Sequence, residues 1–577
     1  WFYADDYRLI GDARAGGLTL EQLGDPFDSQ FMPLGRLIAW VVADSGYVNW
    51  PVAAGSILLL QAIASFACLL MLVVLFGPRW GILPALSIYL FSSITMPAFM
   101  WWAAALNQLP LQAVFFAAVT TWVLHLRSSS KRWFITTIVV LALGLTAYVK
   151  TLLVLPVLAV VMLGWFSSGN AMARIRYCVG RYRLAVVTLI IGPGLFLAYY
   201  LTAVPQVFRD SPAERHSVSD VVLPLADTML VSSLTTGLTG GPWRWLSTNP
   251  PLGTADPPAI VLGLSWLLVL ALAALLFITR RGTLPAWTLF VLYVLGDWFL
   301  VLTSRARIVG DYAGTEYRYL TDVVPVATLC LGLMALELRG APGSSRPRDR
   351  PLLALPRDRP WPVAPAVAAM TALVTVSGVV NTVSYAHIWH TNNPGADYVA
   401  TVRGEVKDGQ TVDVASQVVP RTVIPLLAPP YNHTKVFLPI VSPGYRFPEV
   451  TGRLQVLDEH GRLHNALIKA RSTSQAGPVP GCGWPVVGQA PTQIPTVPTT
   501  TDPESWLRIG YLSSSAGSIT VRAGDSKVET QVDKGVGSLY VHVTGAVDSV
   551  RLEGLLPGES MCVDTVKVGQ PSVGVIP

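Results

Sequence analysis

Residues 52–76 read VAAGSILLLQAIASFACLLMLVVLF, and this run contains no charged residue. A helix needs roughly 17–25 mostly apolar residues to cross a bilayer, and the run has that length. Inside the hydrocarbon every backbone N–H and C=O group must be paired within the segment, so a spanning run of this kind is a helix. The stretch therefore predicts an integral membrane protein.

Similar apolar runs recur along the first two thirds of the chain and predict about ten crossings. They lie near residues 80–97, 110–126, 184–203, 259–278, 284–302, 321–338 and 361–384. Residues 133–166 divide around Lys150, and we expect two short crossings or a re-entrant pair there. The chain starts at Trp1 without a signal-peptide pattern. We expect the first segment to be missing. The basic connections described below place residue 1 outside the cytoplasm, so we expect an odd number of crossings ahead of it, most simply one helix, which gives about eleven in total.

The composition agrees with a membrane protein and excludes several other classes. The chain has 577 residues, of which 52% are hydrophobic and 13% charged, with a mean hydropathy of +0.48. A soluble protein carries about a quarter charged residues, so a soluble enzyme, a disordered chain and a fibrous protein are excluded. The net charge of +6 does not indicate nucleic-acid binding. The excess of Lys and Arg over Asp and Glu lies in the membrane part of the chain, and the region after residue 385 is close to neutral.

Basic residues gather in alternate connections between the apolar runs. These connections carry Arg79, Arg127, Lys131, Arg132, Arg174, Arg176, Arg181, Arg183, Arg280, Arg281 and the arginines between residues 339 and 359. The positive-inside rule places such connections in the cytoplasm. The remaining connections are then extracytoplasmic, namely residues 1–51, 204–258, 303–320 and everything after about 385. We therefore expect a multi-pass protein of the plasma membrane.

The chain changes character after residue 385. Segments 518–522 (SITVR), 538–544 (SLYVHVT) and 549–552 (SVRL) alternate apolar and polar residues, as half-buried strands do. They predict an extracytoplasmic all-β sandwich over residues 386–577, separate from a polytopic α-helical domain over residues 1–385. Residues 486–503 are rich in Pro and Thr, and we expect a linker or long loop.

Two of the five cysteines, Cys482 and Cys562, fall in the region expected to be exported. Disulfides persist in such oxidising surroundings, so the sequence predicts a bridge between them. The alternative is a pair of buried free thiols. No Cys or His spacing matches a structural zinc site.

The first connection contains two adjacent acids, Asp5 and Asp6, in the segment WFYADDYR. Carboxylates beside a membrane are costly unless they are solvated, paired or bound to a cation. Neighbouring acids also raise each other's pKa, which suits one of them to accept a proton. Both are therefore candidate catalytic residues and candidate ligands of a divalent cation. The alternative is an ordinary acidic helix cap.

The same connection continues with Asp28 and Gln30, followed by an apolar stretch at residues 34–42. We expect this stretch to form an amphipathic helix along the membrane interface. Polar groups would then gather over an apolar platform, where a water-soluble substrate and a lipid substrate could meet. Asp28 and Gln30 are therefore candidate substrate-binding residues.

Basic residues in the other external segments suggest an anionic ligand. The candidates for phosphate contacts are Lys150, Arg305, Arg307 and Arg318. The alternative for the lysine is a snorkelling side chain at a helix end, and for the arginines it is pairing with Asp311 and Glu316.

Three further residues, His216, Trp243 and Tyr317, are candidate substrate contacts. A lone His is more often structural, and the Trp fits an aromatic belt at the membrane surface as well as a sugar-stacking role. No Walker A, G-x-G-x-x-G, G-x-S-x-G or H-E-x-x-H motif is present, so a nucleotide is not expected as a direct substrate.

The order of these motifs resembles the GT-C superfamily of integral-membrane glycosyltransferases. The resemblance rests on Ala-Asp5-Asp6-Tyr7 in the first external loop, the break GLTAYVK at residues 144–150, and Arg318-Tyr319 ahead of a helix opened by Pro325. It implies a polyprenyl-phosphate-linked sugar donor, with Asp5 as the general base on the acceptor hydroxyl and Asp6 assisting it or binding a cation. Lys150, Arg305, Arg307 and Arg318 would then contact the phosphate.

The tail resembles the exported carbohydrate-binding-like sandwiches of actinobacterial arabinofuranosyltransferases of the Emb and Aft type. Residues 506–511 (WLRIGY) and 562–564 (CVD) carry this likeness. It implies transfer of arabinofuranose to a cell-wall polysaccharide such as arabinogalactan. A mannosyl- or other-sugar transferase of the same superfamily, a transporter or flippase of lipid-linked sugars, and a non-catalytic glycan-binding scaffold stay open as alternatives.

Overall fold

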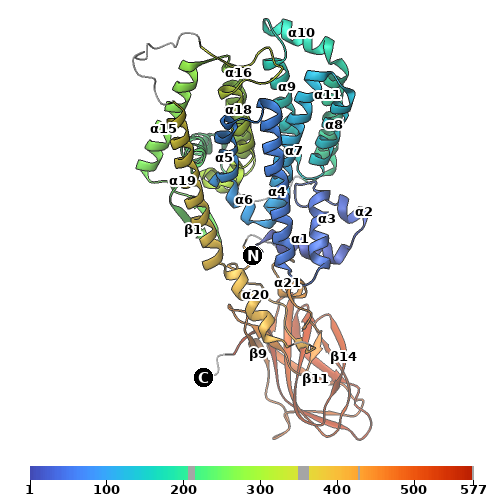
Figure 1. Ribbon diagram of the computed structural model, residues 1–577. Helices are drawn as coiled ribbons and strands as arrows, with labels where there is room; N and C mark the ends of the chain where they lie inside the picture. Colours follow the sequence, from blue (N-terminus) through green and yellow to red (C-terminus); the bar gives the residue numbers. More distant parts are fainter. Residues whose placement is uncertain (206–214, 349–362, 408, 426–428, 575–577) are drawn as a thin grey trace. The chain divides into compact units, whose positions relative to one another are not determined.

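The computed structural model describes residues 1–577 except 206–214, 349–362, 408, 426–428 and 575–577. The chain forms two compact units, Trp1–Asn393 and Pro394–Pro577. The first is helical and the second is built mainly of strands (Figure 1). The basic connection at 349–359 and the start of the run at 361–384 fall on residues outside the described ones.

Eight helical stretches in the described residues are long and apolar enough to cross a membrane. They are Trp50–Phe76 (α4), Trp80–Met100 (containing α5, Leu83–Phe91, and α6, Met96–Met100), Trp102–Ser128 (α7), Arg183–Ala203 (α11), Val218–Leu238, Ala259–Thr279 (α15), Leu284–Thr303 (α16) and a stretch that begins in α19, Val363–Thr391. Two shorter apolar stretches, Val149–Trp165 and Val323–Ala335 (α18), accompany them. The prediction of a multi-pass helical membrane protein is confirmed.

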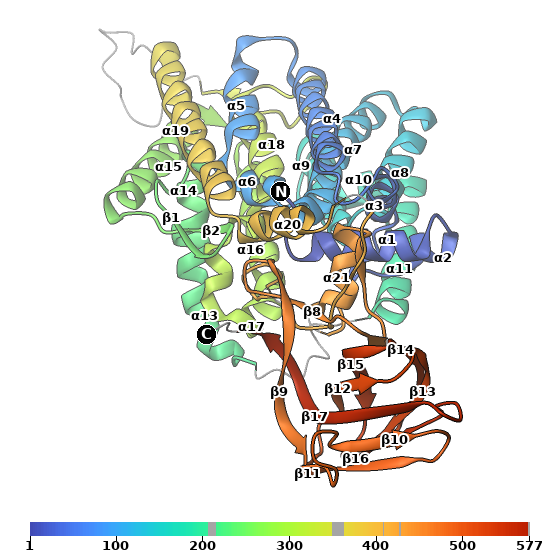
Figure 2. The same cartoon turned by 90° about the horizontal axis from the view of Figure 1, so that it is seen from below.

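Helix α7 is the centre of this unit. It is almost wholly buried and packs against α4 and against α8 (Lys131–Leu145), as Figure 1 shows. By contrast, α11 and α15 expose most of their apolar side chains, and they lie on opposite sides of the unit in Figure 2. Exposed leucines and isoleucines over a whole helix indicate contact with lipid.

Two of the sequence-based assignments in this unit are wrong. Residues 204–258 are not only a connection, because α13 (Val218–Leu225), a π-helical turn (η4, Ala226–Leu234) and α14 (Thr235–Leu238) form one apolar stretch there. The acids Asp220 and Asp227 interrupt its apolar run and hide it from a hydropathy reading. The run at 321–338 is not a full crossing, because α18 has 13 residues and is about 20 Å long, well short of a hydrocarbon core of about 30 Å.

The break predicted around Lys150 is present. Helix α8 ends at Leu145, a 3₁₀ turn (η3, Val149–Leu153) follows, and α9 (Val154–Trp165) continues. Gly144 lies so close to Thr151 and Val114 that a β-carbon there would come within 2.7 Å of both side chains. The small residue therefore permits the tight contact on which the break depends.

The N-terminal segment contributes three helices before α4. These are α1 (Asp5–Gly16), α2 (Leu20–Gly24) and α3 (Pro33–Asp44), and α3 packs against both α1 and α7. The amphipathic helix expected over residues 34–42 is thus present as α3. The contacts of α3 with both helices, and those of α1 with α7, place α1 beside α7.

The second unit begins with α20 (Pro394–Glu405), contains α21 (Thr434–Val441), and is otherwise mainly one large antiparallel sheet. Its path runs β14-β13-β16-β11-β9-β17-β12-β15-β7, with β10 beside β17 and β8 beside β9. The strands are β7 (Val450–Thr451), β8 (Gln455–Leu457), β9 (Leu463–Ser474), β10 (Trp484–Val487), β11 (Thr492–Thr500), β12 (Glu504–Ser513), β13 (Gly517–Ala523), β14 (Ser526–Val532), β15 (Gly535–Thr544), β16 (Val547–Glu553) and β17 (Ser560–Val573). Contacts between β14 and β15 bring the sheet nearly to a barrel around a core of Val, Ile and Leu.

The expected linker at residues 486–503 is wrong. Strand β11 pairs with β16 and with β9 and buries Ile494. The β-branched Thr and Val residues fit a pleated sheet, and the register shifts after Pro495, which lacks an N–H to donate. High Pro content therefore concealed a strand.

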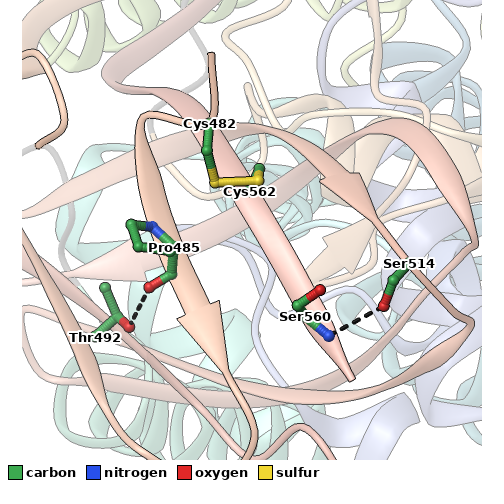
Figure 3. Close-up of a disulfide and its surroundings, with 6 residues drawn as sticks. All are labelled: Cys482, Pro485, Thr492, Ser514, Ser560 and Cys562. Atoms are coloured by element: carbon green, nitrogen blue, oxygen red, sulfur yellow. Dashed lines mark hydrogen bonds between the residues drawn. A yellow bond between two sulfur atoms is a disulfide. The ribbon is translucent and has the colours of Figure 1, made fainter. Parts of the chain in front are cut away.

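Cys482 and Cys562 form the disulfide that the sequence predicts (Figure 3). Cys562 belongs to β17, and Cys482 lies just ahead of β10, which pairs with β17. The bridge fastens the turn before β10 to the central part of the sheet.

We expect the double variant Cys482→Ser/Cys562→Ser to lower the free energy of unfolding of the β unit by about 2–4 kcal/mol, because the bridge closes a loop between residues 80 apart. Thermal unfolding and limited proteolysis of the full chain, with and without reductant, measure the loss. Reductant should destabilise the parent and a Cys178→Ser control but leave the double variant unchanged. Equal stability of parent and double variant would contradict a stabilising bridge.

Candidate active site

A cavity of about 920 Å³ opens in the first unit beside the start of α1 and α7. Its polar lining consists of Asp5, Ser29, Gln30, Asn107, Gln108, Tyr148, Lys150, Tyr200, Arg215, Thr303, Ser304, Arg305, Arg307, Arg318 and Tyr319. The rest of the wall is mainly apolar, with leucines from α1, η3, α11 and α16. The structure thus gathers Asp5 and all four predicted phosphate-contact residues around one space.

Asp5 and Asp6 have different surroundings although they are adjacent. Asp6 is completely buried, and its two carboxylate oxygens accept hydrogen bonds from the backbone N–H groups of Tyr3 and Ala103, each at 2.8 Å. Burial raises the pKa of Asp6 to about 8, and the two backbone hydrogen bonds limit the rise. Asp6 does not line the cavity, so its geometry is that of a structural group.

Asp5 is the acid that lines the cavity. Burial raises the pKa of its carboxyl above the ordinary value, and the negative charge of Asp28 adds to the rise. Arg318, Arg305 and Arg8 act in the opposite direction. A carboxyl group with a raised pKa facing a cavity fits the role of a general base.

The residues that surround Asp5 are held by specific contacts. Asp28 pairs with Arg8 at 2.5 Å and is absent from the cavity lining, so it acts on Asp5 through its charge. Gln30 lines the cavity, and its side-chain oxygen accepts a hydrogen bond from Asn107 at 2.5 Å. Of these two predicted substrate contacts, only Gln30 can touch a ligand in the cavity.

The possible cation site receives no support from this arrangement. Within the described residues, no group of three His, Cys, Asp or Glu side chains could hold a metal ion. Asp6 already offers each of its oxygens to a backbone N–H. A cation shared by Asp5 and Asp6 stays a prediction.

Arg318 is a fixed positive charge in the cavity wall. It forms an ion pair with Glu316, and its guanidinium group lies 4.7 Å from the ring centre of Trp101. Burial alone would lower the pKa of Arg318, but Tyr319, Glu316 and Asp5 raise it above the ordinary value, so the side chain is charged. The pairing with Glu316 that the sequence left as an alternative is present.

Arg307 differs from Arg318 in its contacts. Its Nε atom is buried and has no hydrogen-bond partner within the described residues. The backbone N–H of His216 donates to the carbonyl of Arg307 at 2.8 Å. An unpaired buried donor at a cavity wall is suited to an anionic ligand.

Lys150 is already paired by two carboxylates. Its Nζ atom donates to Asp297 at 2.5 Å and to Asp322 at 2.9 Å, while the hydroxyl of Tyr293 donates to Asp322 at 3.0 Å. Asp297 and Asp322 are both buried. Lys150 is therefore neither a snorkelling side chain nor an independent charge for a phosphate, and its place in the wall is set by this cluster.

Three predicted substrate contacts lie outside the cavity lining. His216 supports Arg307 through its backbone. The indole N–H of Trp243 donates to Ser377 on α19 at 2.9 Å, and the Tyr317 hydroxyl is 2.8 Å from that of Thr236. The contacts of these residues are structural.

Several lining residues escaped the sequence reading. Asn107 and Gln108 lie just ahead of the apolar run at 110–126, and they could have been noticed as polar residues between apolar ones, because such residues face the interior of a helical bundle. Asp297 is likewise a single acid within the run at 284–302. Arg215 and Tyr200 come from different segments, and nothing local marks them.

The fold and the cavity define a multi-pass membrane protein with a polar, arginine-lined cavity and a separate β unit. No protein-family model matches the sequence, and no curated protein matches it. The solved structures that are similar include the arabinofuranosyltransferase AftD from mycobacteria and a mutant form of that enzyme. Both are 12% identical, with TM-scores of 0.33 and 0.32. The matches cover 99% of this chain but only 58% and 59% of the AftD chains, and at this similarity they carry no information about its substrate.

We expect Lys150→Met to destabilise the first unit by about 3–5 kcal/mol, because it leaves two buried carboxylates without their cation. Adding Asp297→Asn and Asp322→Asn should restore part of that loss. Thermal unfolding of the purified protein in detergent measures both effects, and Lys131→Met, an exposed lysine at the start of α8, is the matched control. If Lys150→Met were as stable as this control, the cluster would not hold the cavity wall.

Proposed function

We propose that this protein is a membrane glycosyltransferase that moves a sugar from a polyprenyl-phosphate donor to a hydroxyl group of a glycan. One observation carries the proposal: a carboxyl group with a raised pKa, Asp5, shares a cavity of about 920 Å³ with Arg305, Arg307 and Arg318. Such a site can accept a proton at one place and stabilise a departing phosphate at another.

The lining of the cavity suits a donor that has one charged part and one apolar part. The arginines supply positive charge and directed N–H groups for a phosphate. Leu152, Leu197 and Leu300 supply apolar wall from three different helical segments. A polyprenyl phosphate has this combination, whereas a nucleotide sugar does not.

The proposed reaction is a single displacement. The acceptor oxygen attacks the anomeric carbon, and its proton passes to Asp5. The bond between that carbon and the phosphate oxygen breaks, and its electron pair stays on the phosphate beside Arg307 and Arg318. One base and one displacement invert the anomeric configuration. Asp6 does not act on the substrate in this scheme, and Lys150 acts through its fixed position.

The finer assignments follow from the sequence resemblance. They are arabinofuranose as the sugar, a decaprenyl phosphate as its carrier, a cell-wall polysaccharide such as arabinogalactan as the acceptor, and the extracytoplasmic face as the place of reaction. The β unit would bind glycan and raise its local concentration near the membrane. A mannosyl- or other-sugar transferase would use the same groups.

A transporter of lipid-linked sugars is the second candidate, because one observation favours it. Transporters carry paired ionisable residues within their membrane segments, and Lys150, Asp297 and Asp322 form a buried cluster of this kind. Purified protein with labelled polyprenyl-phospho-sugar and an oligosaccharide separates the candidates, since only a transferase lengthens the oligosaccharide. A non-catalytic scaffold would bind the glycan without any product.

We expect Asp5→Asn to lower the transfer rate by about 10²–10⁴-fold while the protein still folds, because a general base contributes that much. The rate of oligosaccharide elongation measures the loss. Asp12→Asn is the matched control, since this acid lies on the same helix, is absent from the cavity lining and forms a weak pair with Arg8 at 3.9 Å. Full activity of Asp5→Asn would rule out the proposed chemistry.

The raised pKa of Asp5 also predicts the pH dependence. A general base works only when deprotonated, so kcat/KM should fall as the pH drops through this raised pKa, at a pH above the ordinary Asp value of about 3.9. Arg8→Gln removes a charge that lowers this pKa and should move the acid limb to higher pH. A pH profile of kcat/KM for both proteins tests this. An acid limb that stays in place or moves to lower pH in Arg8→Gln would contradict the assignment.

A further inference from the structure

A second cavity, of about 540 Å³, lies between α5, α15, α16, α18 and α19. Its wall is almost entirely apolar, as Ile88, Leu272, Leu331 and Met370 illustrate. We call it the apolar groove. It shares no lining residue with the cavity that holds Asp5. Its surroundings, including the largely exposed helix α15, suit the hydrocarbon chain of a lipid.

A basic pocket of about 490 Å³ adjoins one end of the apolar groove. It is lined by Arg79, Arg339 and Arg346 against a single acid, Glu337. The two cavities meet along the chain, because Leu336 and Pro347 of the groove are each next in sequence to a pocket residue, and Gly81 of the groove is two positions after Arg79.

Arg280 links the two spaces. It lines the apolar groove and pairs across a short ladder with Pro347 in β4 (Arg346–Pro347). Burial lowers the pKa of its guanidinium, Glu337 opposes this change, and Arg79 adds to it. The charges of the pocket therefore reach the end of the groove.

Not every arginine at this end of the helices is available for a ligand. Arg127 donates to the backbone carbonyls of Arg339, Val74 and Leu75, and Arg348 donates to those of Phe277 and Arg280. These two side chains hold the connections together.

Arg339 and Arg346 are exposed in the basic pocket. Arg79 donates one N–H to the backbone carbonyl of Glu337 at 3.0 Å and also lines the pocket. The three arginines outnumber Glu337, so the pocket carries an excess of positive charge.

We propose that the apolar groove and the basic pocket form one binding site for an anionic membrane phospholipid. The headgroup phosphate lies among Arg79, Arg339 and Arg346, and an acyl chain lies along the groove. Basic pockets between membrane helices recognise anionic headgroups, each arginine near the membrane surface adding to the attraction. The adjoining groove gives the same ligand an apolar place, which free phosphate could not use. This site does not depend on the proposed transferase function.

Photolabelling of the full-length protein in phosphatidylcholine nanodiscs tests the site. The probe is a phosphatidylglycerol with a photoreactive group in its acyl chain, added in trace amount. We expect labelled peptides from residues 268–276, 327–335 and 367–375, which line the groove. Unlabelled phosphatidylglycerol should compete, whereas phosphatidylcholine and inorganic phosphate should not.

The double variant Arg339→Gln/Arg346→Gln should lower the labelling by roughly tenfold or more. Arg281→Gln, an exposed neighbour outside both cavities, is the matched control and should label like the parent. The competition series on the unaltered protein keeps the test valid even if the double variant does not fold. The proposal would be overturned if phosphatidylcholine competed as well as phosphatidylglycerol, or if a polyprenyl phosphate competed more strongly. It would also be overturned if inorganic phosphate abolished the labelling, or if a folded double variant labelled like the parent.

Discussion

The buried carboxyl group of Asp6 makes the contact on which the candidate site depends. By accepting hydrogen bonds from the N–H groups of Tyr3 and Ala103, it fastens the first turn of α1 to the first turn of α7. Successive residues of a helix point about 100° apart, so an inward Asp6 leaves Asp5 to face another direction, which here is the cavity. The two acids thus have different roles: Asp6 positions the helix, and Asp5 faces the cavity.

The part of the cavity wall around Lys150 depends on a balance of charges. Lys150 comes from the break after α8, Asp297 from α16, and Asp322 from the turn before α18. Two buried carboxylates cannot both be charged beside each other without a cation, and a buried lysine needs an anion. Together they join three segments and let the chain leave its helix at η3 without exposing an unpaired charge.

The sequence predicts those features that are local. Apolar runs define α4, α7, α11, α15 and α16, and the alternation at 538–544 defines β15. Prediction from the sequence fails where contacts between distant residues determine the structure. Lys150 lies 147 positions from Asp297, so its role as a paired charge leaves no mark in the residues around it. The helix at Val218–Leu238 and strand β11 were missed because acids and prolines mask their patterns.

The charges around Asp5 also suggest why a base and an anion site share one cavity. Arg318 and Arg305 lower the pKa of Asp5, while burial and Asp28 raise it. A phosphate bound at those arginines would cancel part of their charge and so remove the influence that lowers this pKa. Asp5 would then be a stronger base with the donor in place than in the empty cavity. In the proposed reaction the departing phosphate would carry an extra negative charge. The same arginines would then stabilise it more strongly than the intact donor, and this difference would favour the transition state.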